Sequence, residues 1–409
     1  MMPEVRDRIE QIRHGNVPEG YKKGKIGIVP VEWEEVAFSN LFSSMSEYTD
    51  DLKKYPLYSL TIEDGITAKT ERYERSHLVK KENSYKVVRP NDYAYNPMNI
   101  RFGAVARHKG DIPVAVSGYY DIFTTVHESD LVFMDSFLTC DPMITYYNKV
   151  STGSLIEKQR VHFSDFLGFS LALPPLEERK KIAEILTTQD KVIELEGRKI
   201  EEIKKAKQFF LNKMFPKKGQ SVPEIRFKGF TDAWEQRKVQ GVADRFDNLR
   251  IPVAANLRVH GTTPYYGANG IQDYVEGFTH DGEFVLVAED GANDLKNYPV
   301  KCVNGRIWVN NHAHVLQGKA GIADNSFLAF AISQSDIESL LVGGGRAKLN
   351  AETLMSIEFR LPCLQEQYRI GEYLTQLNHL ITLHQRKLEE EKKKKKALMQ
   401  LLLTGIVRV

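Results

Sequence analysis

The chain has 409 residues, of which 42% are hydrophobic and 27% are charged, and its formal net charge is +2 at pH 7. This length exceeds one ordinary domain, and the apolar content is enough for two cores of moderate size. The near-neutral charge excludes a chain that is basic throughout, so a nucleic-acid surface must come from local clusters of lysine and arginine. The sequence contains no apolar run of membrane-spanning length and no signal peptide, so we expect a cytoplasmic protein without a membrane partner.

Residues 1–172 change character near Trp33. Residues 1–30 form a lead-in with a short helical pattern at 5–12. From 31 onward, short runs rich in β-branched and aromatic residues alternate with turn residues, which predicts strands. The runs are 55–61, 85–88, 92–95, 103–107, 114–116, 122–126 and 144–147. We therefore predict a mixed α+β domain over 31–172.

The stretch Leu173-Pro174-Pro175-Leu176-Glu177-Glu178-Arg179 opens a segment, 180–215, that contains no proline. Proline and acidic residues suit the first turn of a helix, and Pro216 marks its end. Apolar residues recur at alternating steps of four and three residues from Ile182 to Met214, the spacing of a seam that packs on another helix. We predict a long helix within 173–215.

The same plan restarts after a linker at 216–230. Trp234 parallels Trp33, strand-like runs follow at 284–288, 300–303, 306–310 and 313–316, and a second mixed domain is predicted over 231–360. Leu361-Pro362-Cys363-Leu364-Gln365-Glu366-Gln367 then repeats the helix start at an offset of 188 residues, and Gly405 ends the segment. A second long helix and tail are predicted over 361–409.

The two predicted helices have seams in the same phase, with seven apolar residues among ten seam positions in each. Two such helices in one chain would most simply pair with each other, while the alternative is that each packs separately on its neighbouring domain. The fold class is therefore α+β, with two mixed α/β domains joined by two long helices that pair as a coiled coil. The predicted coiled-coil interface consists of Leu186, Ile193, Ile200, Ile203, Leu374, Leu377, Ile381 and Leu388.

Local charge in the first domain favours a nucleic-acid surface. Residues 66–90 hold seven lysines and arginines against three glutamates, a local balance of +4, with tyrosine and histidine between them. Cations hold phosphates, while planar and amide side chains address bases. The candidates are Lys69, Arg72, Arg75, Lys80, Lys81 and Arg101, and the alternative is an ordinary solvated surface.

In the second domain the corresponding pattern is weaker. Glycines around 267–270 let a backbone approach DNA closely, and amide side chains can pair bidentately with adenine. The candidates are Tyr266, Asn269, Gln272, Lys296, Arg346 and Lys348, and the alternative for each is an ordinary tight turn.

The sequence predicts no catalytic residues and no metal site. Asn96-Pro97-Met98 and Asp141-Pro142-Met143 lack the second proline and the aromatic residue of an adenine methyltransferase loop. The Gly343-Gly344-Gly345 stretch lacks the ending of a phosphate-binding loop. His312 and His314 have no third ligand in view, and the three cysteines have no Cys-x-x-Cys spacing, so neither a zinc site nor a disulfide framework is predicted.

The chain resembles the specificity subunit of type I restriction-modification systems. The resemblance rests on the paired helix starts, the stretch from Val222 to Arg237 and the ending Leu402-Leu403-Thr404-Gly405. It implies two target recognition domains, each reading one half of a split double-stranded DNA site, held apart by the two long helices as an antiparallel coiled coil in a pseudo-two-fold arrangement. A helical rod about 60 Å long would then set the spacer between the halves. A DNA methyltransferase or nuclease with an unrecognised catalytic centre is the alternative.

The resemblance also implies partners and cofactors. Two modification subunits would bring S-adenosylmethionine for adenine-N6 methylation, and restriction subunits would bring ATP- and Mg-dependent translocation and cleavage. This chain would bind no cofactor, would not be an enzyme by itself, and would position those subunits on DNA.

Overall fold

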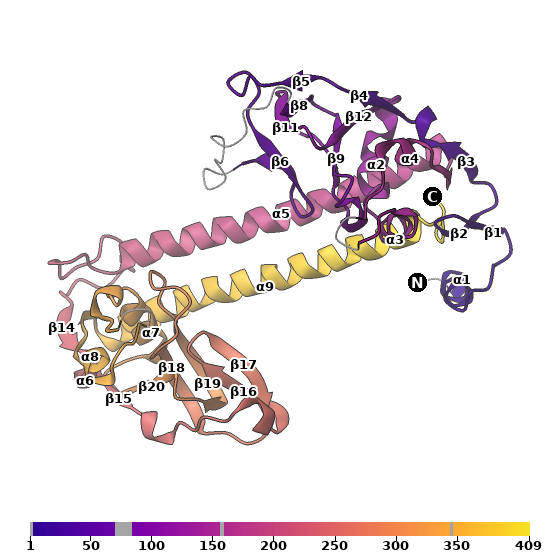
Figure 1. The fold of residues 1–409 in the computed structure, drawn as a ribbon. Helices are drawn as coiled ribbons and strands as arrows, with labels where there is room; N and C mark the ends of the chain where they lie inside the picture. Colours follow the sequence, from indigo (N-terminus) through magenta and orange to yellow (C-terminus); the bar gives the residue numbers. More distant parts are fainter. Residues whose placement is uncertain (1–2, 70–83, 156–158, 344–346) are drawn as a thin grey trace. The chain divides into compact units, whose positions relative to one another are not determined.

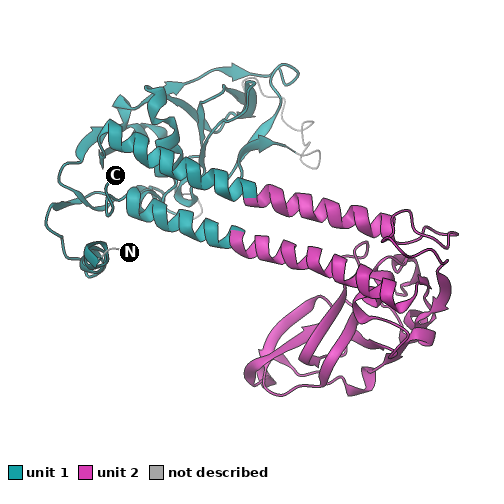
Figure 2. Cartoon of the chain, turned by 180° about the vertical axis from the view of Figure 1, so that it is seen from behind, with its two compact units in different colours: residues 1–195, 388–409 teal, residues 196–387 magenta. Residues whose placement is uncertain are grey.

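The computed structural model describes residues 3–69, 84–155, 159–343 and 347–409. They form two compact units, residues 1–195 with 388–409 (unit 1) and residues 196–387 (unit 2), coloured separately in Figure 2. Each unit contains both sheet and helix, as labelled in Figure 1, so the predicted α+β class is confirmed.

Unit 1 begins with helix α1 (Pro3–Arg13), as the helical pattern at 5–12 predicted, and a hairpin of β1 (Tyr21–Gly24) and β2 (Gly27–Pro30). A four-stranded sheet has the order β10-β9-β12-β4, a three-stranded sheet has the order β11-β8-β5, and β6 pairs with β7. The bounds are β4 Phe42–Met45, β5 Tyr48–Thr49, β6 Tyr58–Thr61, β7 Gly65–Ala68, β8 Tyr85–Val88, β9 Tyr93–Tyr95, β10 Val105–Arg107, β11 Val114–Ser117 and β12 Asp121–Thr125. Helices α2 (Leu131–Phe137), α3 (Asp141–Val150) and α4 (Phe163–Leu167) complete this domain.

The predicted strand at 144–147 is wrong, because these residues lie within α3. A short apolar run can form either a strand or a helix. Here the helix is indicated by Pro142 in its first turn and by the buried residues Met143 and Tyr147, which are four residues apart. That spacing places both side chains on one helix face. The other six strand-like runs of unit 1 overlap β6 and β8 to β12.

Unit 2 is built on a six-stranded sheet in the order β15-β20-β18-β19-β16-β17. The bounds are β15 Ala243–Arg245, β16 His260–Gly267, β17 Gly270–Val275, β18 His280–Ala288, β19 Val300–Val309 and β20 Ala313–Gly318. The two runs predicted at 300–303 and 306–310 belong to the single strand β19. Helix α6 (Val239–Val242) precedes the sheet, α7 (Asn325–Ser333) contacts it, and α8 (Ala351–Ser356) follows.

Each tryptophan noted in the sequence is buried beside a matching pair of strands. Trp33 precedes β3 (Glu34–Ala37), which pairs antiparallel with β13 (Ser170–Leu173) immediately before the first long helix. Trp234 precedes β14 (Glu235–Lys238), which pairs in the same way with β21 (Glu358–Leu361) before the second. The chain thus enters and leaves each mixed domain through one two-stranded ladder.

The long helices are α5 (Leu176–Met214) and α9 (Leu364–Leu402), of 39 residues each. Helix α5 begins directly after Pro175, and α9 begins two residues after Pro362. Both helices therefore start four residues before the predicted segments without proline. Gly405, predicted to end the second helix, has φ of +70°, and a Cβ there would lie 2.5 Å from Pro30. Glycine therefore allows both the turn and the close approach. Figure 2 shows that each helix belongs to unit 1 over one half and to unit 2 over the other.

Within each unit the two helix halves pack antiparallel. In unit 1, Leu186 shares a core with Leu402, and Gln189 donates to the side chain of Glu391 at 2.6 Å. In unit 2, Leu211 shares a core with Leu374, and the rings of Phe210 and Tyr373 lie 5.1 Å apart. All ten predicted seam positions in each helix are buried or half-buried, including the eight proposed interface residues. That these eight residues form the interface between the helices remains a prediction.

The sequence predicted the long helices as separate segments, 173–215 and 361–409. These boundaries remain a prediction. In the described structure each helix half is part of the unit whose sheet it contacts.

Candidate nucleic-acid interface and its helical frame

Each unit contains the same contact between the start of one long helix and the chain just after the end of the other. In unit 1, Arg408 donates to both carboxylate oxygens of Glu178, at 2.5 and 2.9 Å. In unit 2, Arg226 donates to both oxygens of Glu366, at 2.6 and 2.7 Å. Bidentate arginine–carboxylate pairs have fixed geometry, so these contacts orient the helix ends.

Glu178 and Glu366 are each the third residue of their helix, and they are only 6% and 0% exposed. The helix dipole accounts for an acidic residue at these positions, but the sequence does not reveal the arginine partners. The offset of 188 residues between the two glutamates is the sequence feature that indicates a shared role. The Trp33 indole also donates to Glu178, at 3.3 Å, which ties the start of the first recognition domain to the same carboxylate.

The predicted basic surface of unit 1 falls partly outside the described residues, because Arg72, Arg75, Lys80 and Lys81 are not among them. Lys69, at the edge of this segment, is exposed. Of the remaining cations, Lys86 is only 7% exposed and donates to the carbonyl of Tyr120, and Arg89 forms an ion pair with Glu47. Lys69 is therefore the described candidate that presents an accessible cation.

Arg101 was predicted to bind DNA, but the structure places it inside unit 1. It is 7% exposed, its guanidinium donates to Gln159, and its carbonyl accepts a hydrogen bond from Asn148. The Arg101 carbonyl thus connects its turn to α3, and the guanidinium connects it to Gln159. Charge and position in the sequence did not reveal this burial.

Two of the candidates in unit 2 have structural roles that were not predicted. Tyr266 is 6% exposed and belongs to a core cluster with Phe284 and Val309. Asn269 uses both ends of its amide, since its Nδ2 donates to the Gly291 carbonyl and its Oδ1 accepts from the backbone N–H of Asn293. These two bonds join the β16–β17 turn to the loop after β18 and occupy the groups that adenine would require.

Gln272 and Lys296 lie on the exposed surface of unit 2. The Gln272 side-chain oxygen accepts from Asn310 at 3.3 Å, and the backbone N–H of Lys296 donates to Asp294. The Lys296 side chain is thus an accessible cation of unit 2. Arg346 lies outside the described residues.

Lys348 belongs to a cluster of charged groups that fixes the end of its loop to the sheet. Its amine lies 2.8 Å from Glu289, which also accepts from Arg250 at 2.6 Å. Burial alone would raise the pKa of Glu289, but the hydrogen bonds from Lys348 and Arg250 outweigh it and lower that pKa. Lys348 is therefore already paired with a carboxylate, unlike Lys69 and Lys296.

His314, beneath this cluster, is 1% exposed. Its Nε2 lies 2.9 Å from the Leu349 carbonyl and its Nδ1 lies 2.7 Å from Asp247. His312 contacts the Asp290 carboxylate through Nδ1. The two histidines noted in the sequence thus take different carboxylate partners. Among the described residues, no three histidine, cysteine or acidic side chains gather into a potential metal site.

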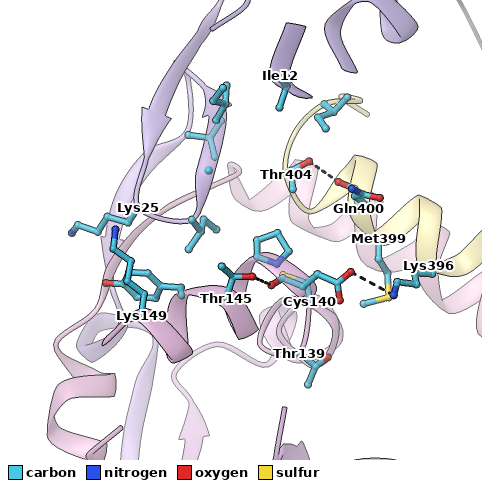
Figure 3. A pocket seen from close by; sticks show the side chains of 18 residues that line it. Ile12, Lys25, Thr139, Cys140, Thr145, Lys149, Lys396, Met399, Gln400 and Thr404 are labelled. Atoms are coloured by element: carbon cyan, nitrogen blue, oxygen red, sulfur yellow. Dashed lines mark hydrogen bonds and ion pairs between the residues drawn. The ribbon is translucent and has the colours of Figure 1, made fainter. Parts of the chain in front are cut away.

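A cavity of about 730 Å³ in unit 1 lies between the β1–β2 hairpin, the start of α3 and the end of α9 (Figure 3). Lys25, Lys149 and Lys396 line it together with apolar side chains such as Met399. Cys140 also lines it, but burial raises the pKa of this thiol to about 12. A thiol with that pKa is protonated near neutral pH and is a poor nucleophile. The cavity therefore offers a surface for binding rather than an activated cysteine.

Both halves of the sequence repeat match one protein family. The sequence matches the Type I restriction modification DNA specificity domain over residues 30–205 and again over residues 231–392. The chain belongs to the type I specificity family. The two matched ranges fall on the two halves of the sequence repeat, each including a recognition domain and most of its long helix.

Relatives of this specificity chain include bacterial and archaeal proteins. The putative type I restriction enzyme specificity subunit S.HindORF215P of Haemophilus influenzae is 44% identical over 36% of this chain and 38% of its own length. The MjaVIII specificity subunit of Methanocaldococcus jannaschii is 24% identical over 60% of this chain and 63% of its length. The putative MjaX specificity subunit of the same organism is 25% identical over 99% and 93%. The first two alignments thus span less than two thirds of the relative.

Solved structures show the same fold at low sequence identity. The S subunit of a type I restriction-modification system from M. genitalium superimposes with a TM-score of 0.63, at 12% identity, over 93% of this chain and 99% of that chain. A chain from a study of complex assembly and conformational transition of the type I R-M system gives a TM-score of 0.53 at 16% identity, over 93% and 99%. The described part of this specificity chain contains no helix with the length and apolarity to cross a membrane.

Proposed function

We propose that this chain reads a bipartite double-stranded DNA site, with one half-site bound by the recognition domain of each unit. The observation that supports this most strongly is a repeated frame with different contents. Each unit has one tryptophan with a two-stranded ladder and one arginine–glutamate contact. The main sheets of the two units differ in the number and order of their strands. A repeated frame fixes two modules in the same way, and unlike modules suit two unlike target sequences.

We further propose that the helix pair sets the spacer between the half-sites. A helix of 39 residues is about 58 Å long at 1.5 Å per residue, which corresponds to about 17 base pairs of DNA. The seam, buried or half-buried within each unit, and the paired helix ends support this proposal. Helix length is then the property that selects which half-site separation can be bound.

The proposal assigns catalysis to other subunits. Two modification subunits would bind S-adenosylmethionine and methylate adenine, and restriction subunits would supply ATP- and Mg-dependent translocation and cleavage. This chain would hold those subunits at the site, bind no cofactor itself, and act in the cytoplasm, where bacterial and archaeal DNA is accessible.

The test is to express this chain together with its modification subunit and to map methylated adenines on a plasmid by single-molecule sequencing. We expect a split motif with one modified adenine in each half, and no methylation by either protein alone. Methylation at a continuous motif, or the same pattern in the absence of this chain, would contradict the proposal.

A further inference from the structure

A polar cluster around one buried carboxylate lies at the middle of the paired long helices, with the His384 side chain 21% and the Lys387 side chain 51% exposed. Glu196 of α5 is 3% exposed, and its carboxylate lies 2.7 Å from Nδ1 of His384 and 2.9 Å from the Lys387 amine, both on α9. We call Glu196, His384 and Lys387 the central cluster. All three belong to unit 2.

Glu196 and His384 occupy equivalent positions, since each is the 21st residue of a 39-residue helix and they are 188 residues apart. When two equivalent helices pair antiparallel, equivalent residues face each other only at the midpoint. If α5 instead paired in this alignment with α5 of a second copy, Glu196 would face a second Glu196. Two buried carboxylates at contact distance repel strongly.

The positions seven residues from this midpoint follow the same rule. Gln189 precedes Glu196 by seven residues and bonds to Glu391, which follows His384 by seven. The same alignment sets Ile203 opposite Leu377, and both are half-buried. Pairing of α5 with α9 therefore matches polar with polar and apolar with apolar. Pairing of α5 with another α5 would set Gln189 against Ile203, and pairing of α9 with another α9 would set Glu391 against Leu377.

The arginine–glutamate contacts at the two ends of the helices are of one chemical kind. Each joins a buried glutamate at the third helical position to an arginine in the chain that follows the other helix. This kind of contact does not by itself distinguish α5 from α9, whereas the residues in the middle of the seam do.

We propose that the central cluster, with the Gln189–Glu391 pair, selects α9 as the partner of α5 and rejects pairing of a helix with its own counterpart from a second copy of the chain. A polar residue at one seam position is an effective device for selecting alignment and partner, because the wrong pairing leaves buried charge unmatched. If the proposed function holds, this selection keeps one copy of each recognition domain in every complex.

The test uses two full-length chains with different affinity tags, one carrying Glu196→His and the other His384→Glu. Each variant alone has like groups at its midpoint, so we expect a lower midpoint of thermal unfolding than in the unchanged chain. When the two are expressed together, α5 of each finds a complementary α9 in the other. We expect them to co-purify in a 1:1 ratio with the unfolding midpoint restored.

Two controls keep the test decisive. Unchanged chains with the two tags should not co-purify, and the single chain Glu196→His/His384→Glu should be monomeric with a restored midpoint, which shows that lost stability in the single variants is due to charge and not to misfolding. Co-purification of unchanged chains to the same extent as the variant pair would overturn the proposal, as would single variants with an unchanged midpoint. The test contains no DNA and no modification subunit, so its outcome is independent of the proposed function.

Discussion

Arg226 and Glu366 form a bidentate ion pair in which the carboxylate is fully buried and the arginine side chain is 12% exposed. The two residues are 140 positions apart in the sequence. The glutamate holds the pKa of Arg226 above its usual value, so the guanidinium stays protonated. Its counterpart in unit 1, Arg408 with Glu178, is more accessible because Arg408 is 35% exposed.

Replacement of Glu366 by Gln should therefore destabilise the protein strongly. The change leaves the Arg226 guanidinium buried without its counter-charge, for which we expect a decrease of about 3 kcal/mol in the free energy of unfolding. Glu201→Gln is the matched control, because Glu201 pairs with Lys204 on the exposed side of α5 and such pairs contribute less than about 1 kcal/mol. Urea unfolding measures both, and equal decreases would show that burial does not determine the strength of the pair.

Acid should weaken the central cluster before it weakens the apolar seam. Hydrogen bonds from Lys387 and then from His384 lower the pKa of Glu196 to about 2, from a usual value of 4.5. A carboxylate with a lowered pKa stabilises the fold above its unfolded-state pKa and loses this contribution as pH falls toward its folded-state pKa. The stabilisation should be complete above about pH 5 and should decline between pH 4.5 and pH 2.

The measurement is the difference in thermal unfolding midpoint between the unchanged chain and Glu196→Gln as a function of pH. Glutamine does not titrate, so the difference should shrink as pH falls from about 5 toward 2. A difference that stayed constant down to about pH 3 would mean that Glu196 does not contribute through its charge.

Exchange of one recognition domain should change one half of the DNA site. The ladders suggest where to join the chains: replacing residues 38–169 retains both β3 and β13, and the new junctions then lie at the hydrogen bond from the Phe38 N–H to the Phe169 carbonyl, at 2.7 Å. The equivalent exchange in unit 2 is 239–357, bounded by the Val239 to Ile357 bond at 3.0 Å.

Methylation mapping of the two exchanged chains, each with the modification subunit, should show altered bases in opposite halves of the motif. If either exchange altered both halves, the two domains would not read DNA independently.

Shortening both long helices together should shorten the DNA spacer. Deletion of 197–203 from α5 and 377–383 from α9 removes seven facing residues from each helix and retains the Glu196–His384 pair. Seven residues correspond to about 10 Å of helix and therefore to about three base pairs of DNA. Methylation mapping should give the same half-sites with a shorter spacer.

Deletion of 197–203 alone puts the seams out of alignment and should abolish methylation. An unchanged spacer in the double deletion would exclude the helix pair as the ruler.

Accessible lysines of the recognition domains should contribute to the salt dependence of DNA binding. Removing one lysine that binds a phosphate should reduce the slope of log K against log salt concentration by about 1. We expect this for Lys69→Gln and Lys296→Gln, and a smaller change for Lys348→Gln, because Lys348 is already paired with Glu289. Lys205→Gln, at an exposed position of α5, is the matched control. The complex with modification subunits should be titrated with DNA over a range of salt concentrations. Equal slopes of log K against log salt concentration for all four variants would show that these lysines do not bind DNA phosphates.

The sequence by itself determined the frame. The four-three spacing of apolar residues predicted positions of α5 and α9 that are buried or half-buried, because helical periodicity is a local property of neighbouring residues. The repeat at 188 residues and the matched tryptophans likewise predicted two similar attachments for two different domains, and these are the β3–β13 and β14–β21 ladders.

Tertiary structure decided which polar residues are accessible. Arg101 and Lys69 look alike in the sequence, yet one is buried against Gln159 and the other is exposed. Asn269 is held by backbone groups more than 20 residues away, and Glu178 by an arginine 230 residues away. Hydrogen-bond partners at such separations are brought together only by the folding of the whole unit, so local composition could indicate a charged or amide-rich surface but not which of its side chains remain available to a ligand.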